Sequence, residues 1–338
     1  MKHRFSILPL ALVGLVSLSS CQASGIKVNK DKEHYVVGIS QYVTHAALDA
    51  ATLGFKESLT EELKQNNRTV SFIDGNCQGE PSLCTVIAST LISRNVDLIM
   101  ANATAPFQAL VNATTYIPII GTSITSYEQA LGRPLKDDTT GLNATGTSDL
   151  APLDKQAEMI FDLVDNPKNI GILYCSSEPN SLYQVNRIEK EISKVAGLKN
   201  LDVEVKRYPF VDSNEVEQIA RKASQDNDVI YTPTDNTVAS TSKTIYAATK
   251  NGKNGKRTPI ICGEEGPCIN TGLATLTISY YDLGALTGKM AADILLGKQD
   301  IRQMKVRPSD KFTKKYHEGH AKEAGIPIDD RFDGFVKL

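Results

Sequence analysis

The sequence lacks the signatures of metal sites and of common catalytic machinery. It has only five histidines and no Cys-x2-Cys pair, so it offers no set of closely spaced zinc ligands. Nucleophile-elbow and Walker motifs are also missing. Glu264 and Glu265 are neighbouring carboxylates, but adjacent residues of an extended segment point to opposite faces and make no natural acid–base pair. We therefore expect no catalytic residues, no cofactor and no metal.

An excess of positive charge is missing as well. The formal net charge is -2 at pH 7 and no basic stripe runs along the chain, so nucleic acid is not an expected partner. Hydrophobic residues make up 41% of the sequence, which is typical of a globular protein. The 338 residues are enough for two domains with their own cores.

Long apolar runs are confined to the N-terminus. Residues 7–18 are mainly apolar, follow the basic Lys2-His3-Arg4, and are too short for a standard membrane-spanning helix. The next residues, Leu18-Ser19-Ser20-Cys21, resemble a bacterial lipobox, whose cysteine receives a lipid anchor with acyl chains such as palmitate. We expect a lipoprotein signal peptide over residues 1–20 and a lipidated cysteine with a linker over residues 21–33. The protein would then be exported and lipid-anchored to the bacterial cell membrane; an ordinary secretory signal with an incidental Cys21 is the alternative.

Export changes the interpretation of the other cysteines, because disulfides persist outside the cytosol. Cys77 and Cys84 are close in sequence, and so are Cys262 and Cys268. Two local disulfides, Cys77–Cys84 and Cys262–Cys268, are therefore possible. Cys175 would remain free and buried at the end of a strand.

Strand-like and helical patterns alternate along the chain. Short apolar runs predict strands, and amphipathic runs between them predict helices, an order typical of parallel sheets covered by helices. The strands are expected at 36–40, 69–73, 96–100, 117–120, 169–174, 203–208, 228–231 and 258–262. The helices are expected at 46–63, 81–93, 106–112, 153–164, 181–195, 213–224, 283–296 and 317–324. A further helix is expected to begin at residue 237.

The alternation stops twice, in glycine-containing stretches at 139–147 and 272–280, which we interpret as crossings between two lobes. The fold class is therefore α/β, with two Rossmann-like lobes whose parallel sheets are joined by hinge crossings. We expect an N-terminal lobe of residues 34–146 plus 276–304 and a C-terminal lobe of residues 147–275 plus 305–338.

Polar side chains follow the predicted strands, where α/β sheets bind their ligands. In the first lobe these candidates are Gln41, Tyr42, Ala103, Thr104, Thr122 and Ser123. In the second lobe they are Ser177, Asn180, Thr234, Asp235, Asn236, Glu264 and Glu265, and Tyr280 follows the second crossing. Together they predict a small-molecule site in a cleft between the lobes. His45, at the start of the first helix, is expected to be a cap-region residue.

The same strand ends carry a family resemblance, from about residue 34 to the C-terminal region. The chain resembles the substrate-binding lipoproteins of ABC transporters of the TrpX type, a branch of the type I periplasmic binding proteins. The matching segments are Gly38-Ile39-Ser40-Gln41-Tyr42-Val43-Thr44-His45, Ala103-Thr104-Ala105, Tyr174-Cys175-Ser176-Ser177-Glu178-Pro179-Asn180-Ser181, Pro233-Thr234-Asp235-Asn236-Thr237-Val238-Ala239-Ser240 and Tyr280-Tyr281-Asp282-Leu283-Gly284. The chain departs from the family pattern at Cys175, where Asn is common, and at Cys77, Cys84 and Cys268.

The resemblance implies a binding protein rather than an enzyme. It would capture an amino acid, often an aromatic one, and deliver it to an ABC permease and its ATPase. A nucleobase, a small peptide or a ligand-sensing role stays open as an alternative.

A free amino acid is a zwitterion and needs two opposite partners. Thr104 at a helix N-terminus, with Thr122 and Ser123, could hold its carboxylate. Asp235 is the expected ammonium partner and Glu265 the second choice, unless Asp235 only caps its helix. Tyr42, Phe107, Tyr183 and Tyr280 are the candidates for an aromatic wall.

Overall fold

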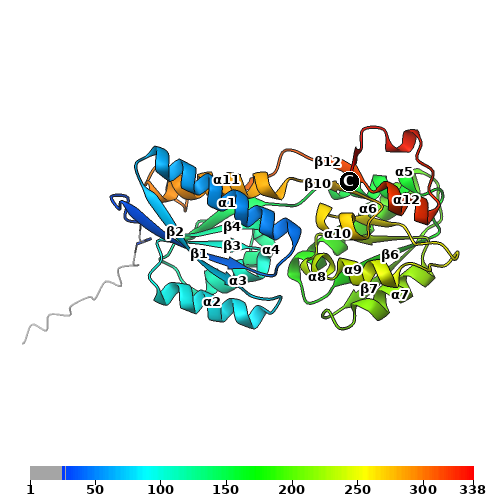
Figure 1. Cartoon of the computed structure of the whole chain (residues 1–338), viewed down its shortest axis with the longest axis horizontal. Helices are drawn as coiled ribbons and strands as arrows, with labels where there is room; N and C mark the ends of the chain where they lie inside the picture. Colours follow the sequence, from blue (N-terminus) through cyan, green and yellow to red (C-terminus); the bar gives the residue numbers. More distant parts are fainter. Residues whose placement is uncertain (1–24, 27) are drawn as a thin grey trace, which may run out of the picture.

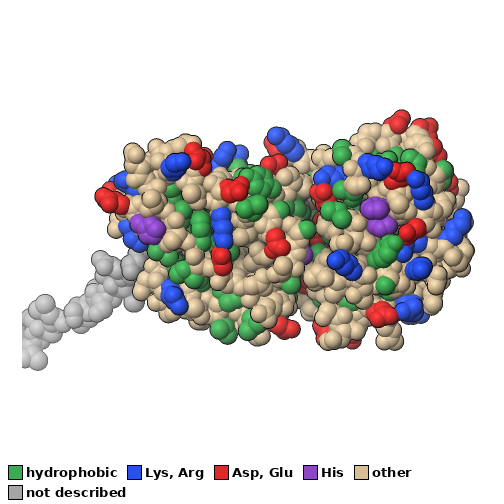
Figure 2. Space-filling model, viewed as in Figure 1, with side chains coloured by type: hydrophobic (Ala, Val, Ile, Leu, Met, Phe, Trp, Pro, Cys, Tyr) green, Lys and Arg blue, Asp and Glu red, His purple; other side chains and the backbone are tan. Residues whose placement is uncertain are grey.

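The computed structural model describes residues 25, 26 and 28–338, which form two α/β lobes side by side (Figure 1). The predicted signal peptide and the lipidation site Cys21 lie outside the described residues. Within the described part of the chain, no helix has the length and apolar character needed to cross a membrane. Side chains of both charges are interspersed over the face shown in Figure 2, in keeping with the small net charge.

The N-terminal lobe is built on a parallel sheet in the order β11-β5-β4-β3-β1-β2. Its strands are β1 (His34–Gln41), β2 (Thr69–Asn76), β3 (Leu98–Asn102), β4 (Ile119–Ile124), β5 (Ala144–Ser148) and β11 (Arg307–Pro308). Its helices are α1 (Ala46–Gln65), α2 (Pro81–Ser93), α3 (Thr104–Ala113), α4 (Tyr127–Leu131) and α11 (Tyr280–Leu295). Helices α1 and α11 cover one face around Phe55 and Met290, and α2 and α3 cover the other around Leu91 and Phe107.

The C-terminal lobe repeats this plan with the sheet order β13-β12-β10-β9-β8-β6-β7. Its strands are β6 (Asn169–Cys175), β7 (Glu204–Phe210), β8 (Val229–Thr232), β9 (Ile260–Cys262), β10 (Ala274–Thr277), β12 (Thr313–Tyr316) and β13 (Val336–Lys337). Its helices are α5 (Leu153–Leu163), α6 (Pro179–Leu198), α7 (Val216–Asp226), α8 (Asn236–Ser240), α9 (Ser242–Ala248), α10 (Glu265–Asn270) and α12 (Glu318–Ala324), with a 3-10 turn at Asp330–Phe332. The order β7-β6-β8-β9-β10 matches β2-β1-β3-β4-β5 of the first lobe, which confirms the predicted pair of Rossmann-like lobes.

The chain crosses between the lobes three times, from β5 to α5, from β10 to α11 and from β11 to β12. The two stretches predicted to be crossings instead contain β5 and β10, so the crossings begin a few residues later than expected, near Asp149, Ile278 and Ser309. These strands looked like loops because four of their buried residues are threonine and one, in β5, is glycine. The hydroxyls of β5 have partners outside the strand: Thr145 Oγ1 donates to Met304 O at 3.0 Å, and Thr147 Oγ1 lies 2.8 Å from Thr287 Oγ1 of α11.

Helices α1 and α11 pack with their backbones almost in contact. A Cβ atom at Gly54 would lie 2.1 Å from Tyr281 O, and one at Gly284 would lie 1.9 Å from Ala51 O. Only glycine fits at these two positions without separating the helices. The start of α11, which follows the second crossing, is therefore held directly against the start of α1.

The cysteines follow the prediction in part. Cys77 and Cys84 form a disulfide that joins the loop after β2 to α2, and Cys175 is a buried free thiol at the end of β6. The predicted second disulfide was wrong, because Cys262 and Cys268 are both free. Their sulfur atoms pack beside Gly272 in the core between the sheet and α7–α10. Closeness in sequence does not by itself give the mutual geometry that a disulfide requires.

Candidate functional site

The ends of the strands of the two lobes face each other across a narrow cleft. Two hydrogen bonds join its walls: His45 Nε2 lies 3.2 Å from Asn236 Oδ1, and Gln129 Nε2 donates to Pro179 O at 2.5 Å. His45 and Gln129 belong to the N-terminal lobe, and Pro179 and Asn236 to the C-terminal lobe. The lobes are therefore already in contact around the cleft.

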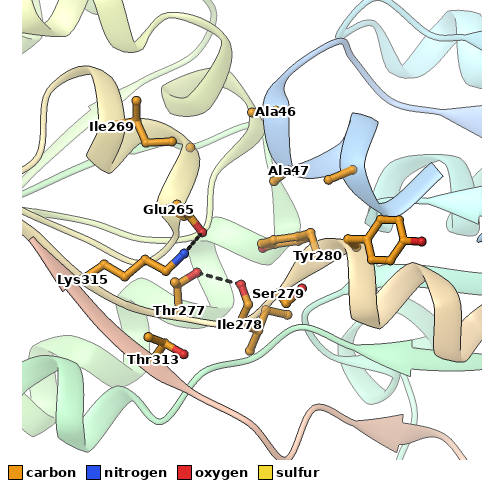
Figure 3. A pocket seen from close by; sticks show the side chains of 13 residues that line it. Ala46, Ala47, Glu265, Ile269, Thr277, Ile278, Ser279, Tyr280, Thr313 and Lys315 are labelled. Atoms are coloured by element: carbon orange, nitrogen blue, oxygen red, sulfur yellow. Dashed lines mark hydrogen bonds and ion pairs between the residues drawn. The ribbon is translucent and has the colours of Figure 1, made fainter. Parts of the chain in front are cut away.

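Two cavities straddle the lobes. The first, of about 280 Å³, is lined by Tyr42, Ala105 and Gln108 on one side and by Ser177, Asn180 and Asn236 on the other. The second, of about 300 Å³, lies beside the crossings (Figure 3). There Glu265 and Lys315 face each other, with a separation of 2.7 Å, opposite Ala46 and Ala47 of α1.

The N-terminal lobe presents two buried hydroxyl groups, one on a residue with a strained backbone, Ser123, and one directly after such a residue, Thr104. Ala103 and Ser123 have φ values of 96° and 57°, and they lie at the ends of the neighbouring strands β3 and β4. Such conformations are costly for residues other than glycine and cluster at ligand sites. Thr104 Oγ1 and Ser123 Oγ are both buried, and neither has a hydrogen-bond partner among the described residues.

Thr104 is also the first residue of α3, and its N-cap residue, Ala103, has no side chain that could cap the helix. The first backbone N–H groups of a helix have no partner within it and carry a partial positive charge. Together with the two hydroxyls, these N–H groups can donate hydrogen bonds to an anion such as a carboxylate. This corner has the chemistry expected of a carboxylate trap. Thr122 contributes less, because its Oγ1 accepts from Thr147 Oγ1 at 3.3 Å.

Asp235, the expected ammonium partner, is occupied within its own lobe. Its Oδ1 accepts from Val238 N at 2.8 Å, and its Oδ2 accepts from Cys175 N and Ser181 Oγ, each at 2.7 Å. The side chain is fully buried, and burial together with nearby Glu178 raises its pKa. In this arrangement Asp235 caps α8 and joins that helix to β6 and α6, and no group of a ligand is needed to complete its bonding.

The other polar side chains that follow the strands of this lobe are also hydrogen-bonded to one another. The carboxylate of Glu178 accepts from the backbone and side chain of both Asn236 and Thr237, at 2.7–3.1 Å, and from Asn180 Nδ2 at 3.1 Å. Asn180 Nδ2 also donates to Thr234 O, and Ser177 Oγ donates to Val211 O at 2.8 Å. The predicted site residues Ser177, Asn180, Thr234 and Asn236 therefore build the wall of the cleft together with Glu178, which was not predicted to be a site residue.

Glu264 differs from Asp235 and Glu178, because its carboxyl group has no hydrogen bond to the described residues of its own lobe. It is the N-cap residue of α10, yet its side chain makes no capping bond. The residue is 2% exposed, and both carboxyl oxygens are buried with no hydrogen-bond partner in the described part of the chain. Burial, with Asp149 and Asp235 nearby, raises its pKa well above the usual range. A buried carboxyl group without a partner is costly unless it serves a ligand.

Asp149 lies next to Glu264 and was missed by the sequence analysis. It stands at the start of the first crossing, where it accepts from Tyr280 Oη at 3.0 Å and from Thr125 Oγ1 at 3.2 Å. Burial raises the pKa of Asp149 to about 6. Its only signal in the sequence was an acidic residue two positions after the predicted crossing 139–147. Glu265, the second choice for the ammonium, is instead paired with Lys315.

Of the remaining candidates, some line the cavities and others only stabilise their own lobe. Gln41 donates to Asp49 Oδ1 at 2.7 Å and accepts from Thr52, so it organises its own lobe. Of the proposed aromatic wall, Tyr42 and Tyr280 each line one of the cavities described above. Phe107 is instead buried in the core against Tyr127, and Tyr183 stacks with the guanidinium of Arg187, so neither lines these cavities.

Comparison with known proteins agrees with this architecture. The model of the ABC transporter substrate binding protein family matches residues 36–333. A tyrosine-binding protein of Clostridioides difficile (strain R20291) is 32% identical over 304 residues, which are 88% of this chain and 85% of the relative. The structure of an ABC domain in complex with L-Trp from Streptococcus pneumonia is 28% identical, with a TM-score of 0.79 over 89% of this chain and 99% of that one.

The arrangement of the lobes can also be compared. The ligand-free, open structure of a substrate binding protein from Clostridium difficile is 32% identical and covers 90% of this chain and 99% of that one, but its TM-score is only 0.64. The L-Trp complex is less identical in sequence and superposes better. Since both comparisons cover nearly the same share of the chain, the lobes here lie closer to the ligand-bound arrangement, in keeping with the contacts across the cleft. The chain has the fold of the type I periplasmic binding proteins and belongs to the ABC transporter substrate binding protein family, whose members bind solutes and are not enzymes.

Proposed function

We propose that this protein is the extracytoplasmic, lipid-anchored binding component of an ABC importer, and that it captures a free aromatic amino acid between its lobes. Tyrosine, tryptophan and phenylalanine are the candidate ligands. One relative binds tyrosine and a solved neighbour holds L-Trp, which supports an aromatic side chain. The captured amino acid would pass to the permease and its ATPase.

One observation carries the proposal: the two lobes offer buried polar groups of opposite character, and these groups have no partner among the described residues. The N-terminal lobe offers the hydroxyl donors of Thr104 and Ser123 at the positive end of α3. The C-terminal lobe offers the carboxyl oxygens of Glu264. An α-amino acid has a carboxylate for the first and an ammonium for the second. The 280 Å³ cavity beside Tyr42 offers room for a flat side chain.

Calorimetric titration with the three aromatic amino acids tests the proposal. We expect at least one of them to bind, and we expect its affinity to depend on both charged ends. For tyrosine, the matched probes are tyramine, which lacks the carboxylate, and 3-(4-hydroxyphenyl)propionate, which lacks the ammonium. Both should bind at least about a hundredfold more weakly, because each leaves one buried group of the protein unpaired. Failure of all twenty amino acids to bind or to raise the melting temperature would refute the amino-acid assignment.

The membrane anchor has a separate test. Labelled palmitate should be incorporated into the full chain expressed in a bacterium, and Cys21→Ala should abolish the incorporation. Incorporation that persists in this variant would refute the lipidation site without affecting the proposed ligand.

A further inference from the structure

We propose that Glu264, with Tyr280 and Asp149, forms a proton-exchanging ammonium receptor at the hinge: the free protein holds a proton there, and the ammonium group of the ligand displaces it. The inference rests on the proposed function, because the displacing ligand is the amino acid of the previous section. It adds a chemical step to binding and predicts that binding depends on pH.

The receptor is built where two of the three crossings meet. Asp149 begins the first crossing, Tyr280 begins α11 just after the second, and Glu264 follows β9 at the N-terminus of α10. Tyr280 Oη donates to Asp149 Oδ2 at 3.0 Å and lies beside Glu264 as well. A phenol has one proton to donate, so the same hydroxyl cannot satisfy both carboxylates at once.

Among the described residues, no group of opposite charge faces Glu264 to balance a negative charge on its carboxylate. The titratable groups that face it are Asp149 from the crossing, Asp235 from the cap of α8, Cys262 from β9 and Tyr280 from α11. All four are acids, so none of them can neutralise a second buried carboxylate. Lys315, the cation beside the neighbouring Glu265, is paired with that carboxylate at 2.7 Å. Two carboxyl groups that share a buried site do not both ionise without a cation.

Burial gives the same direction for both acids, since it raises the pKa of Asp149 to about 6 and that of Glu264 well above its usual range. We assign the proton of the free protein to Glu264, because its carboxyl oxygens have no partner among the described residues. Asp149, by contrast, already accepts hydrogen bonds from Tyr280 and Thr125. When a primary ammonium arrives, the carboxyl group of Glu264 releases its proton to solvent and the resulting carboxylate accepts N–H bonds from the ligand. Charge is conserved, since one positive charge enters the site as another leaves.

The positions of the three receptor residues would also couple ammonium binding to closure of the two lobes. Asp149 lies at the start of the first crossing and Tyr280 at the end of the second, whereas Glu264 belongs to the C-terminal lobe. An ammonium bound by all three would hold the hinge in one arrangement. Ligand capture and lobe closure would then share a single charged contact.

Proton release can be measured directly by titration calorimetry with an aromatic amino acid in buffers of different ionisation enthalpy. We expect the wild-type protein to release about one proton per bound ligand near neutral pH. Its affinity should fall as the pH is lowered from about 8 to about 5, because protons compete with the ammonium. Glu264→Gln should release none, lose this pH dependence and bind about a hundredfold more weakly.

Glu189→Gln is the matched control, since it changes a carboxylate of the same lobe that is paired with Arg207 and lines neither cavity. It should keep both the affinity and the proton release of the wild type. Asp149→Asn and Tyr280→Phe give a second route if Glu264→Gln fails to fold, and each should reduce the released fraction of a proton. Ligand binding with the same heat in every buffer would overturn the receptor while leaving the proposed function intact. Absence of any amino-acid binding would instead overturn the proposed function.

Discussion

The two lobes share one sheet order but present opposite chemistry to the cleft. The N-terminal lobe offers two neutral hydroxyls beside the positive end of α3: Ser123, whose backbone is strained, and Thr104, which follows the strained Ala103. The C-terminal lobe offers carboxyl groups. Those of Asp235 and Glu178 accept hydrogen bonds from their own lobe, whereas that of Glu264 has no partner among the residues described. A duplicated plan can thus bind a molecule with two unlike ends, because the segments that follow corresponding strands carry different side chains.

A second contrast lies within the C-terminal lobe itself. Asp235 and Glu264 both occupy N-cap positions of short helices at the ends of β8 and β9. Asp235 accepts three hydrogen bonds from its own lobe, while Glu264 accepts none from the described residues. The same type of residue at the same local position is therefore structural in one case and available to a ligand in the other.

Replacing Asp235 should have the largest effect and should act on stability. Asp235→Ala leaves Val238 N, Cys175 N and Ser181 Oγ without their acceptor in a buried site. We expect the free energy of unfolding to fall by about 2–4 kcal/mol, measured by urea denaturation.

Asp235→Asn is the matched variant, because it keeps one acceptor oxygen and should be milder. If Asp235→Ala were as stable as the wild type and yet failed to bind ligand, the contrast between the two acids would be reversed.

Thr104→Val should have opposite effects on binding and on stability. Valine has a similar volume and lacks the buried hydroxyl that has no partner in the described structure. We expect ligand affinity to fall about tenfold to thirtyfold, while the melting temperature of the free protein stays equal or rises.

Thr122→Val is the control, since that hydroxyl already accepts from Thr147. It should lower stability and change affinity less. Equal losses of stability in both variants would show that the Thr104 hydroxyl has a structural partner after all.

The stability of the free protein should depend on pH through Asp149. Its pKa is raised to about 6 in the folded state, so the folded protein binds more protons than the unfolded chain between about pH 4 and pH 6. Stability contributed by this group is therefore gained as the pH falls through that window and lost as it rises. We expect the melting temperature of Asp149→Asn to lack this component when it is compared with the wild type across the window; identical pH profiles would contradict it.

The smallest expected effect concerns the bond between the lobes. His45→Ala removes the contact of the imidazole with Asn236 Oδ1, which exists only while the lobes are together. We expect the ligand to dissociate about threefold to tenfold faster, since a hydrogen bond of this kind contributes about 1 kcal/mol, measured by stopped-flow fluorescence. His34→Ala changes a histidine that contacts Thr69 and Ser71 at the far side of the same lobe, and its dissociation rate should match the wild type.

The fold was largely predictable from sequence because periodicity reports burial locally. The strands and helices of both lobes follow from runs such as 96–100 and 169–174. The crossings were misplaced because β5 and β10 bury four threonines, and β5 also a glycine, residue types that are common in loops. The partners of the β5 hydroxyls, Met304 O and Thr287 Oγ1, lie about 140–160 residues away in the chain and could not be foreseen.

The site was predictable only as a set of strand ends. Sequence places Asp235 and Glu264 at such ends but cannot say which carboxylate is already satisfied. That depends on Ser181 and on the backbone of Cys175, which lie more than fifty residues away from Asp235 in the chain. Asp149 could not be recognised, since its importance comes from the hydroxyl of Tyr280 beyond the second crossing. His45 was expected to be a local cap, yet within the described structure its side chain makes no capping bond and reaches the other lobe instead.

The glycine contact between α1 and α11 limits how this protein can be re-engineered. His45 precedes one helix and Tyr280 begins the other, so the contact at Gly54 and Gly284 sets the spacing between two elements of the cleft. A designer who wishes to change ligand preference can vary residues at the ends of the strands whose side chains have no hydrogen-bond partner among the described residues, such as Thr104 and Ser123. Any side chain added at either glycine would instead alter the receptor, the bond between the lobes and the hinge together. This part of the scaffold should therefore be kept unchanged in a sensor or a library built on the fold.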